Sequence, residues 1–165
     1  MLRPPSAAVP TGLRSRFLAA GLVSVVAWAL LRTLAPGEAI PWTPPMEEAA
    51  NSMARAVAAV ADECLRQEIP VDPILDPNGT CLIGPEQSHL FTSLGQLEAK
   101  RTATNPDMAG LLVHLLARAG VGAGDSVAVG ASGSFPGLLV ATLSAVSALG
   151  ARPVTILSLG ASSFG

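Results

Sequence analysis

Two apolar runs near the end of the chain, Ser126 to Gly130 and Pro153 to Gly160, constrain its fold more than any other feature. Neither run alternates between apolar and polar residues, as a strand with one solvated face would. The apolar stretch between them, Gly137 to Leu149, is typical of a helix and is followed by Gly150, a residue that commonly ends one. Such a pattern predicts a parallel β–α–β unit with both faces of the sheet covered. The alternative is a membrane span from Val127 to Leu149, which the glycines, serines and proline in its first half disfavour.

A second constraint is FLAAGLVSVVAWALL, Phe17 to Leu31, which holds fifteen residues without a charge between Arg16 and Arg32. A bilayer span needs about 20 apolar residues, with about 17 as the lower limit. Arg32 can extend its side chain to the headgroups, so a short span over residues 17–34 is feasible. We therefore predict a transmembrane anchor. Two alternatives remain, a buried helix and a cleaved signal peptide, although TLAPGEAI makes a poor cleavage site.

The charges are distributed unevenly along the chain. The first 32 residues hold four arginines and no acid, whereas the rest holds all twelve acids and six of the ten bases. Basic residues stay on the cytoplasmic side, so residues 1–16 are predicted to be a cytoplasmic basic tail. The body would then lie outside the membrane, with the lipid bilayer as a partner. Its acidic balance argues against nucleic acid as a partner.

The anchor is followed by a proline-rich linker, residues 35–45, and then by an extracytoplasmic α/β domain, residues 46–165. Trp42 either sits at the headgroup level or covers the core of the body. Apolar residues at helical spacing predict one helix from Met46 to about Ile69, with Thr43 as its N-cap. A second helix begins at Pro106, after Thr104 or Asn105 as the cap, and ends at Gly120. Its buried stripe is expected to contain Leu111, Leu112, Leu115 and Leu116. A short strand is possible at 80–83, and the polar segment that follows it shows no clear periodicity.

Cys64 and Cys81 are the only cysteines. Outside the cytoplasm they could form a disulfide, which in the chain-entropy model would contribute about 3 kcal/mol. Alternatively they are separate thiols, one on a buried helix face and one in a strand. Two cysteines and two distant histidines make no zinc pattern, so no metal and no cofactor are expected.

The two buried strands end in similar sequences, VAVGASGSF and LSLGASSFG. Neighbouring parallel strands lie about 5 Å apart, so the two glycine- and serine-rich loops should flank one crevice at the carboxyl edge of the sheet. Ser132, Ser134 and Ser162 are the candidate residues there. They could bind an anion or carboxylate beside the N-terminus of the following helix, or simply form tight turns.

A third interpretation makes Ser132 or Ser134 a nucleophile. The sequence around Ser132 misses the G-x-S-x-G elbow by one position, because Ser134 stands where the last glycine should be. A nucleophile also needs a base. Only His89 and His114 are present, and nothing requires either of them to reach the crevice. No Gly-Lys-Ser or Gly-Lys-Thr follows, which excludes a Walker loop.

LEAKRTATNP contains Lys100 and Arg101, the only adjacent basic pair in the body. Together with Asn105 and its neighbouring threonines, these residues could hold a carboxylate. The alternative is a solvated loop whose charges have no function.

Four motifs, LIGPE, LEAKRTATNP, VAVGASGSFP and LGASSFG, occur between Asp76 and Gly165. In these motifs the chain resembles the bacterial poly-gamma-glutamate system protein family, whose members also have an N-terminal membrane anchor. The resemblance implies a role in making or exporting poly-gamma-glutamate, an anionic capsule polymer, and it supplies no catalytic residue. Family members extend beyond Gly165, and two strands are few for a parallel sheet, so we expect the α/β domain to be incomplete.

Two functions from different classes therefore remain. The first is a membrane-anchored accessory protein that binds poly-gamma-glutamate or the subunits that synthesise and export it. Lys100, Arg101, Ser132 and Ser134 would contact carboxylates, with Asn105 and Ser162 beside them. The alternative is a serine-dependent hydrolase or transferase that acts on gamma-glutamyl bonds through Ser132 or Ser134. The chain is thus predicted to be an α/β protein, and its sequence leaves open whether it is an enzyme.

Overall fold

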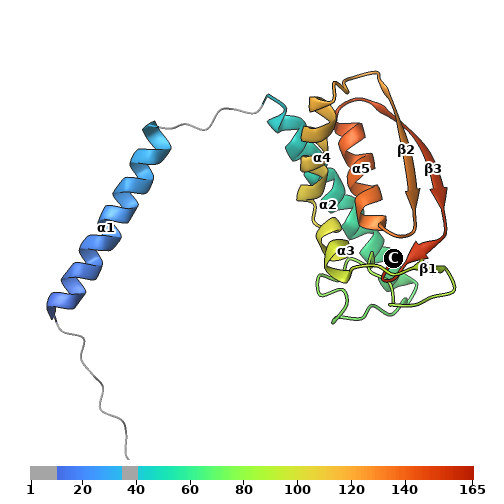
Figure 1. The fold of residues 1–165 in the computed structure, drawn as a ribbon, viewed down its shortest axis with the longest axis horizontal. Coiled ribbons are helices and arrows are strands. Elements are labelled where there is room, and N and C mark those ends of the chain that lie inside the picture. Colours follow the sequence, from blue (N-terminus) through green and yellow to red (C-terminus); the bar gives the residue numbers. More distant parts are fainter. Residues whose placement is uncertain (1–10, 35–40) are drawn as a thin grey trace, which may run out of the picture. The chain divides into compact units, whose positions relative to one another are not determined.

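The computed structural model describes residues 11–34 and 41–165, with the side chains described from residue 16 onward. Within these residues the chain is a mixed α/β protein with five helices and short parallel strands. It divides into two units, one containing helix α1 (Thr11–Leu34) and one from Pro41 to Gly165 (Figure 1). The predicted tail and linker lie partly outside the described residues, at positions 1–10 and 35–40.

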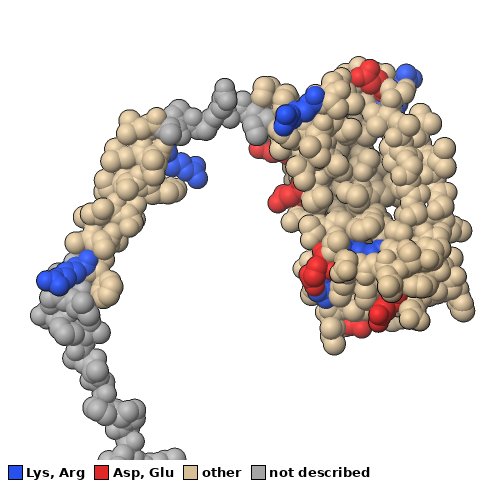
Figure 2. All heavy atoms as spheres, in the orientation of Figure 1, with Lys and Arg blue, Asp and Glu red and all other residues tan. Residues whose placement is uncertain are grey.

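Helix α1 contains a 19-residue stretch, Arg16–Leu34, with a mean hydropathy of 1.9. At 1.5 Å per residue this stretch spans about 28 Å, close to the thickness of a bilayer's hydrocarbon core. Basic side chains lie near both ends of the helix and none is seen between them (Figure 2). The helix is therefore long and apolar enough to cross a membrane, although a signal sequence meets the same criteria.

Helix α2 (Thr43–Arg66) opens the body. Its two prolines occupy the first turn, where no intrahelical N–H bond is lost. The N-cap is Trp42, so the predicted cap, Thr43, is instead the first helical residue. The helix ends three residues before the predicted Ile69, because Glu68 adopts the left-handed conformation with φ 54°. The N–H of Ile69 then bonds the carbonyl of Cys64 at 2.9 Å, which closes a Schellman motif.

Helices α4 (Asp107–Arg118) and α5 (Pro136–Ala148) pack with α2 to form the core. The predicted ends at Gly120 and Gly150 are confirmed, since both glycines have a positive φ and close Schellman motifs. The core residues are small or unbranched, two from each helix: Ala49, Met53, Ala109, Val113, Ala141 and Ala145. The predicted leucine stripe of α4 is wrong in part, because Leu111 and Leu115 are exposed and Leu112 and Leu116 border the core. Close approach of α2 favours small residues on the buried face of α4.

Trp42 packs against this core, and its indole Nε1 donates a hydrogen bond of 2.9 Å to Nδ1 of His114. The second alternative for Trp42, a cover over the core, is therefore the one observed. The contact also places His114 within the helical layer, as the acceptor of the tryptophan N–H.

Strands β2 (Ser126–Ser132) and β3 (Arg152–Ser158) form the predicted parallel pair, with Ser132 opposite Ser158. They are joined by α5, which lies between this pair and helices α2 and α4 (Figure 1). The prediction that both faces are covered is wrong. Every residue of β3 is exposed, including Ile156 at 78%. Helices pack from one side only, and no described element covers the other. The segment Val127–Leu149 is a strand, a loop and a helix, which excludes the alternative of a second membrane span.

Three elements were not predicted, two in the polar segment and one after β3. The polar segment after residue 84 contains strand β1 (Phe91–Ser93) and helix α3 (Leu97–Ala103). β1 pairs in parallel with β4 (Ala161–Ser162), which follows β3. The expected strand at 80–83 is absent, because Cys81 has φ 57°, a conformation outside the strand region. Short elements of two to seven residues carry too little periodicity to detect in a sequence.

Cys64 and Cys81 form a disulfide, so the bonded alternative is the one observed. The carboxylate of Asp76, which is buried, accepts hydrogen bonds from the Thr80 hydroxyl at 3.0 Å and from the Cys81 N–H at 2.7 Å. This Asx-type network shapes the Asn-Gly turn that presents Cys81 to the end of α2.

Gly137 sits where α5 meets α3. A Cβ at this position would lie 2.6 Å from the carbonyl oxygen of Ala103. We expect Gly137→Ala to lower the free energy of unfolding by about 1–3 kcal/mol, because the two helices must separate. Chemical denaturation of the full chain in detergent micelles measures the change. Gly130→Ala is the matched control, since nothing lies within 4 Å of its added methyl group. Equal stability of the two variants would contradict the close approach.

Candidate functional site

The two serine loops meet at the carboxyl edge of the β2–β3 pair, as predicted. The N–H of Gly133 donates to the carbonyl of Ser158 at 3.1 Å, and the N–H of Ser162 donates to Oγ of Ser134 at 3.0 Å. A Cβ on Gly133 would lie 3.3 Å from that of Ala161. The loops are thus in direct contact, with hydroxyl groups and backbone amides joining them.

Lys100 reaches these loops from helix α3, and only 1% of the residue is exposed. Its Nζ lies 2.8 Å from Oγ of Ser162 and contacts the carbonyl oxygen of Ser134. The Phe135 ring covers the amine, with its centroid 4.5 Å from Nζ. Three of the predicted site residues, Lys100, Ser134 and Ser162, therefore come together in one buried cluster, which we call the lysine–serine cluster.

The lysine–serine cluster contains no acid. No carboxylate of the described residues pairs with Lys100. Desolvation by the surrounding loops lowers the pKa of the Lys100 amine below its ordinary value of 10.5. Burial thus disfavours the charged form of the amine.

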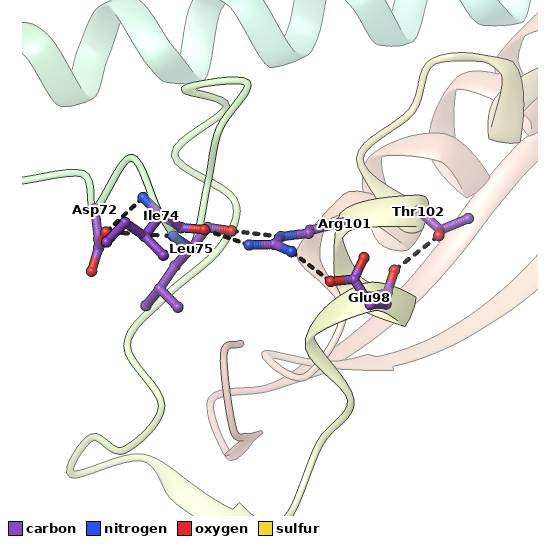
Figure 3. A network of polar contacts seen from close by, with 6 residues as sticks. All are labelled: Asp72, Ile74, Leu75, Glu98, Arg101 and Thr102. Carbon is purple, nitrogen blue, oxygen red and sulfur yellow. Dashed lines mark hydrogen bonds and ion pairs between the residues drawn. The ribbon is translucent and has the colours of Figure 1, made fainter.

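Arg101, the next residue along α3, points elsewhere. Its Nε donates to the carbonyl of Leu75 at 2.9 Å, and its two terminal nitrogens contact the carbonyl of Ile74 and the carboxylate of Glu98 (Figure 3). The Asp72 carboxylate holds the same turn by accepting a 2.7 Å hydrogen bond from the Ile74 N–H. Arg101 thus attaches the 72–75 turn to α3 and keeps two of its five N–H groups for other partners.

Asn105 lies at the start of α4, where its Oδ1 accepts a 3.0 Å hydrogen bond from the N–H of Asp107. Its side chain therefore satisfies a helix-terminal N–H, as the sequence predicts, although Pro106 is the residue at the N-cap position. The amide nitrogen of its side chain has no hydrogen-bond partner among the described residues.

Arg101 and Asn105 line the same groove, which has a volume of about 650 Å³. Small apolar residues of α2 form one wall: Ala54, Val57, Ala58 and Ala61. The opposite wall is polar, with Asn78 and Thr80 from the Asn-Gly turn and Thr102 and Thr104 from around the end of α3. None of the residues that line this groove is acidic. We call it the α2–α3 groove.

Ser132 belongs to neither place. It lines a smaller cavity of about 240 Å³ between β2 and α5, together with Phe135, Leu138 and Thr142 among others. Its Oγ accepts a 3.3 Å hydrogen bond from the N–H of Ser134. Neither Ser132 nor Ser134 has a general base at hydrogen-bond distance from its hydroxyl among the described residues.

The sequence therefore indicated the residues of the site but not their grouping. The separation of Lys100 from Arg101 depends on α3, which places successive residues about 100° apart around its axis. Phe135 and Gly95, which also contact the cluster, were not predicted. Only their positions in the sequence could have indicated them, because Phe135 directly follows the first serine loop and Gly95 precedes α3.

Comparison with known protein families, curated proteins and solved structures found no match to this chain. The class is thus defined by the structure alone, as a mixed α/β body with an N-terminal apolar helix and a buried lysine–serine cluster.

The lowered pKa of Lys100 gives a stability that depends on pH. Between the pKa of the folded state and the ordinary 10.5, the unfolded chain binds more protons, so stability rises with pH through this window. Lys100→Met lacks this contribution. The free energy of unfolding of the wild type should therefore increase relative to that of the variant as pH rises. Denaturation of both proteins in micelles from about pH 7 to about pH 10.5 measures the difference. Parallel pH curves would show that the amine is not desolvated.

Proposed function

We propose that this chain is a membrane-anchored accessory protein of poly-gamma-glutamate synthesis or export, and that its body binds the anionic polymer. The observation that carries the proposal is the α2–α3 groove, which is lined by Arg101 and Asn105 among others and by no acid, although the body is acidic overall. The sequence motifs that resemble the poly-gamma-glutamate system proteins include its residues Arg101, Thr104 and Asn105.

The chemistry of the groove fits a gamma-linked glutamate chain. Each unit of this polymer carries one carboxylate, one amide and two methylene groups. The alanine-rich wall of α2 offers apolar surface to the methylenes. The two remaining N–H groups of Arg101 and the amide nitrogen of Asn105 can donate to a carboxylate. An accessory protein could also act in another way, by binding to subunits of the synthase or exporter.

The proposed location rests on three features. α1 is long and apolar enough to span a bilayer, and the arginines that precede it favour a cytoplasmic N-terminus. The Cys64–Cys81 disulfide is typical of an oxidising compartment. Together they favour a single-pass protein whose body lies outside the cytoplasmic membrane, where an exported polymer passes.

We expect Asn105→Asp to weaken polymer binding at least tenfold. The aspartate keeps the oxygen that accepts from Asp107 but replaces a donor with a charge that repels carboxylates. Calorimetric titration of the full chain in detergent micelles with poly-gamma-glutamate measures the affinity. Asn51→Asp is the matched control, because it makes the same change at an exposed position of α2 outside the groove.

In this titration the wild type should also lose affinity as salt rises, since the contacts are ionic. Equal affinities of Asn105→Asp and Asn51→Asp would exclude the groove as the binding site. No binding by the wild type at low salt would refute the proposed function itself.

Alkaline phosphatase fused after Gly165 should be active in a bacterial host, because the enzyme requires disulfides that form outside the cytoplasm. The fusion should remain in the membrane pellet after an alkaline carbonate wash. An inactive fusion would indicate the opposite orientation, with the body on the cytoplasmic side. An active but released fusion, shortened by the mass of its leader, would identify α1 as a signal peptide.

A further inference from the structure

We propose that Ser162 is a nucleophile for acyl transfer from an amide substrate, with Lys100 as its general base. This activity goes beyond polymer binding and does not depend on the α2–α3 groove. It also moves the nucleophile away from Ser132 and Ser134, the serines that the sequence indicated.

The geometry of the lysine–serine cluster supports these roles. A nucleophilic serine needs a base within about 2.6–3.2 Å of its hydroxyl, and Nζ of Lys100 lies 2.8 Å from Oγ of Ser162. The base must in turn be oriented by a third group. That group is the carbonyl of Ser134, which accepts a hydrogen from the amine. Pairs of serine and lysine without a histidine are one of the known variants of this arrangement.

The surroundings of the amine favour loss of its proton. A lysine beside a carboxylate holds its proton tightly, but no carboxylate of the described residues pairs with Lys100. Burial to 1% exposure disfavours the charged form, and the lowered pKa follows from it.

The neighbouring serines have different contacts. Oγ of Ser134 accepts the N–H of Ser162, so it fixes the backbone of the nucleophile. Oγ of Ser132 accepts the N–H of Ser134. These hydrogen bonds form a chain from Ser132 through Ser134 to Ser162 and help to position Ser162 against Lys100.

Gly95 has no side chain, and this leaves the space in which the side chains of Lys100 and Ser162 meet. A Cβ at this position would lie 3.0 Å from Oγ of Ser162 and 3.1 Å from Cε of Lys100. It would also lie 2.7 Å from the carbonyl oxygen of Ser163, a backbone atom that cannot easily move. Any side chain here would displace one member of the pair.

The reaction balances without a cofactor. Oγ of Ser162 forms a bond to the amide carbon of the substrate while its proton passes to Nζ of the neutral Lys100. The C–N bond then breaks, and the Lys100 ammonium returns that proton to the leaving amine. Water attacks the resulting ester, Lys100 takes the proton from the water, and the proton returns to Oγ as the carboxylic acid leaves. A base that carries the proton to the leaving nitrogen suits an amide substrate.

Access to the nucleophile is narrow, since 8% of Ser162 is exposed. The substrate must therefore present its carbonyl in an extended and slender segment. Ser162 belongs to β4, and the pairing of β4 with β1 over Phe91–Ser93 holds its backbone in place.

The test is a fluorophosphonate probe, which phosphonylates nucleophilic serines with loss of fluoride. The full chain in detergent micelles should gain one probe mass, located on Ser162 by peptide mapping. The labelling rate should rise with pH through the pKa of the Lys100 amine. Lys100→Met should slow labelling by about 10²–10⁴-fold, the usual contribution of a general base. Ser162→Ala should abolish labelling, and Ser147→Ala, an exposed serine of α5, should leave the rate unchanged.

Circular dichroism confirms that each variant is folded. If Lys100→Met does not fold, the pH dependence of the wild-type rate still tests the base. No label on Ser162 in the folded wild type, or a label on a different serine, would overturn the proposal. A labelling rate that does not change with pH, or that survives Lys100→Met, would overturn the role of the lysine.

Discussion

The amine of Lys100 connects three segments that lie far apart in the sequence. It extends from α3 to the carbonyl of Ser134 after β2 and to the hydroxyl of Ser162 in β4. Burying a lysine is costly unless its polar atoms find partners, so these contacts must form together. Lys100 therefore links α3 to the first serine loop and to β4, which pairs with β1. Gly137, which permits α3 to approach α5, makes the arrangement possible.

Two neighbouring residues of α3 have separate tasks. Lys100 faces the interior, whereas Arg101 holds the 72–75 turn and borders the α2–α3 groove. One short helix thus contributes to both the buried cluster and the open groove. The proposed binding function belongs to the groove and the proposed acyl transfer to the cluster, and the two are chemically compatible. A protein that binds an amide-linked polymer in one place could act on an amide bond in another.

Several elements followed from local sequence. The capping glycines Gly120 and Gly150 ended their helices as predicted, because only a residue that tolerates a positive φ closes a Schellman motif without strain. The β–α–β unit followed from two apolar runs without alternation. The end of α2 could not be predicted in the same way, since Glu68 adopts a left-handed conformation that its side chain disfavours. Helix α3 was missed because seven residues make only two turns and its buried face is largely a single lysine.

The sequence by itself determined the apolar N-terminal helix, the C-terminal ends of α4 and α5, the parallel strand pair and the meeting of two serine loops. Each of these depends on a local pattern of apolar, glycine or charged residues. Only the tertiary structure decided that Lys100 is buried while Arg101 is not, that Ser162 rather than Ser132 lies against the amine, and that the two cysteines are bonded. These outcomes depend on contacts between residues up to 62 positions apart, such as Lys100 and Ser162, which no local pattern encodes.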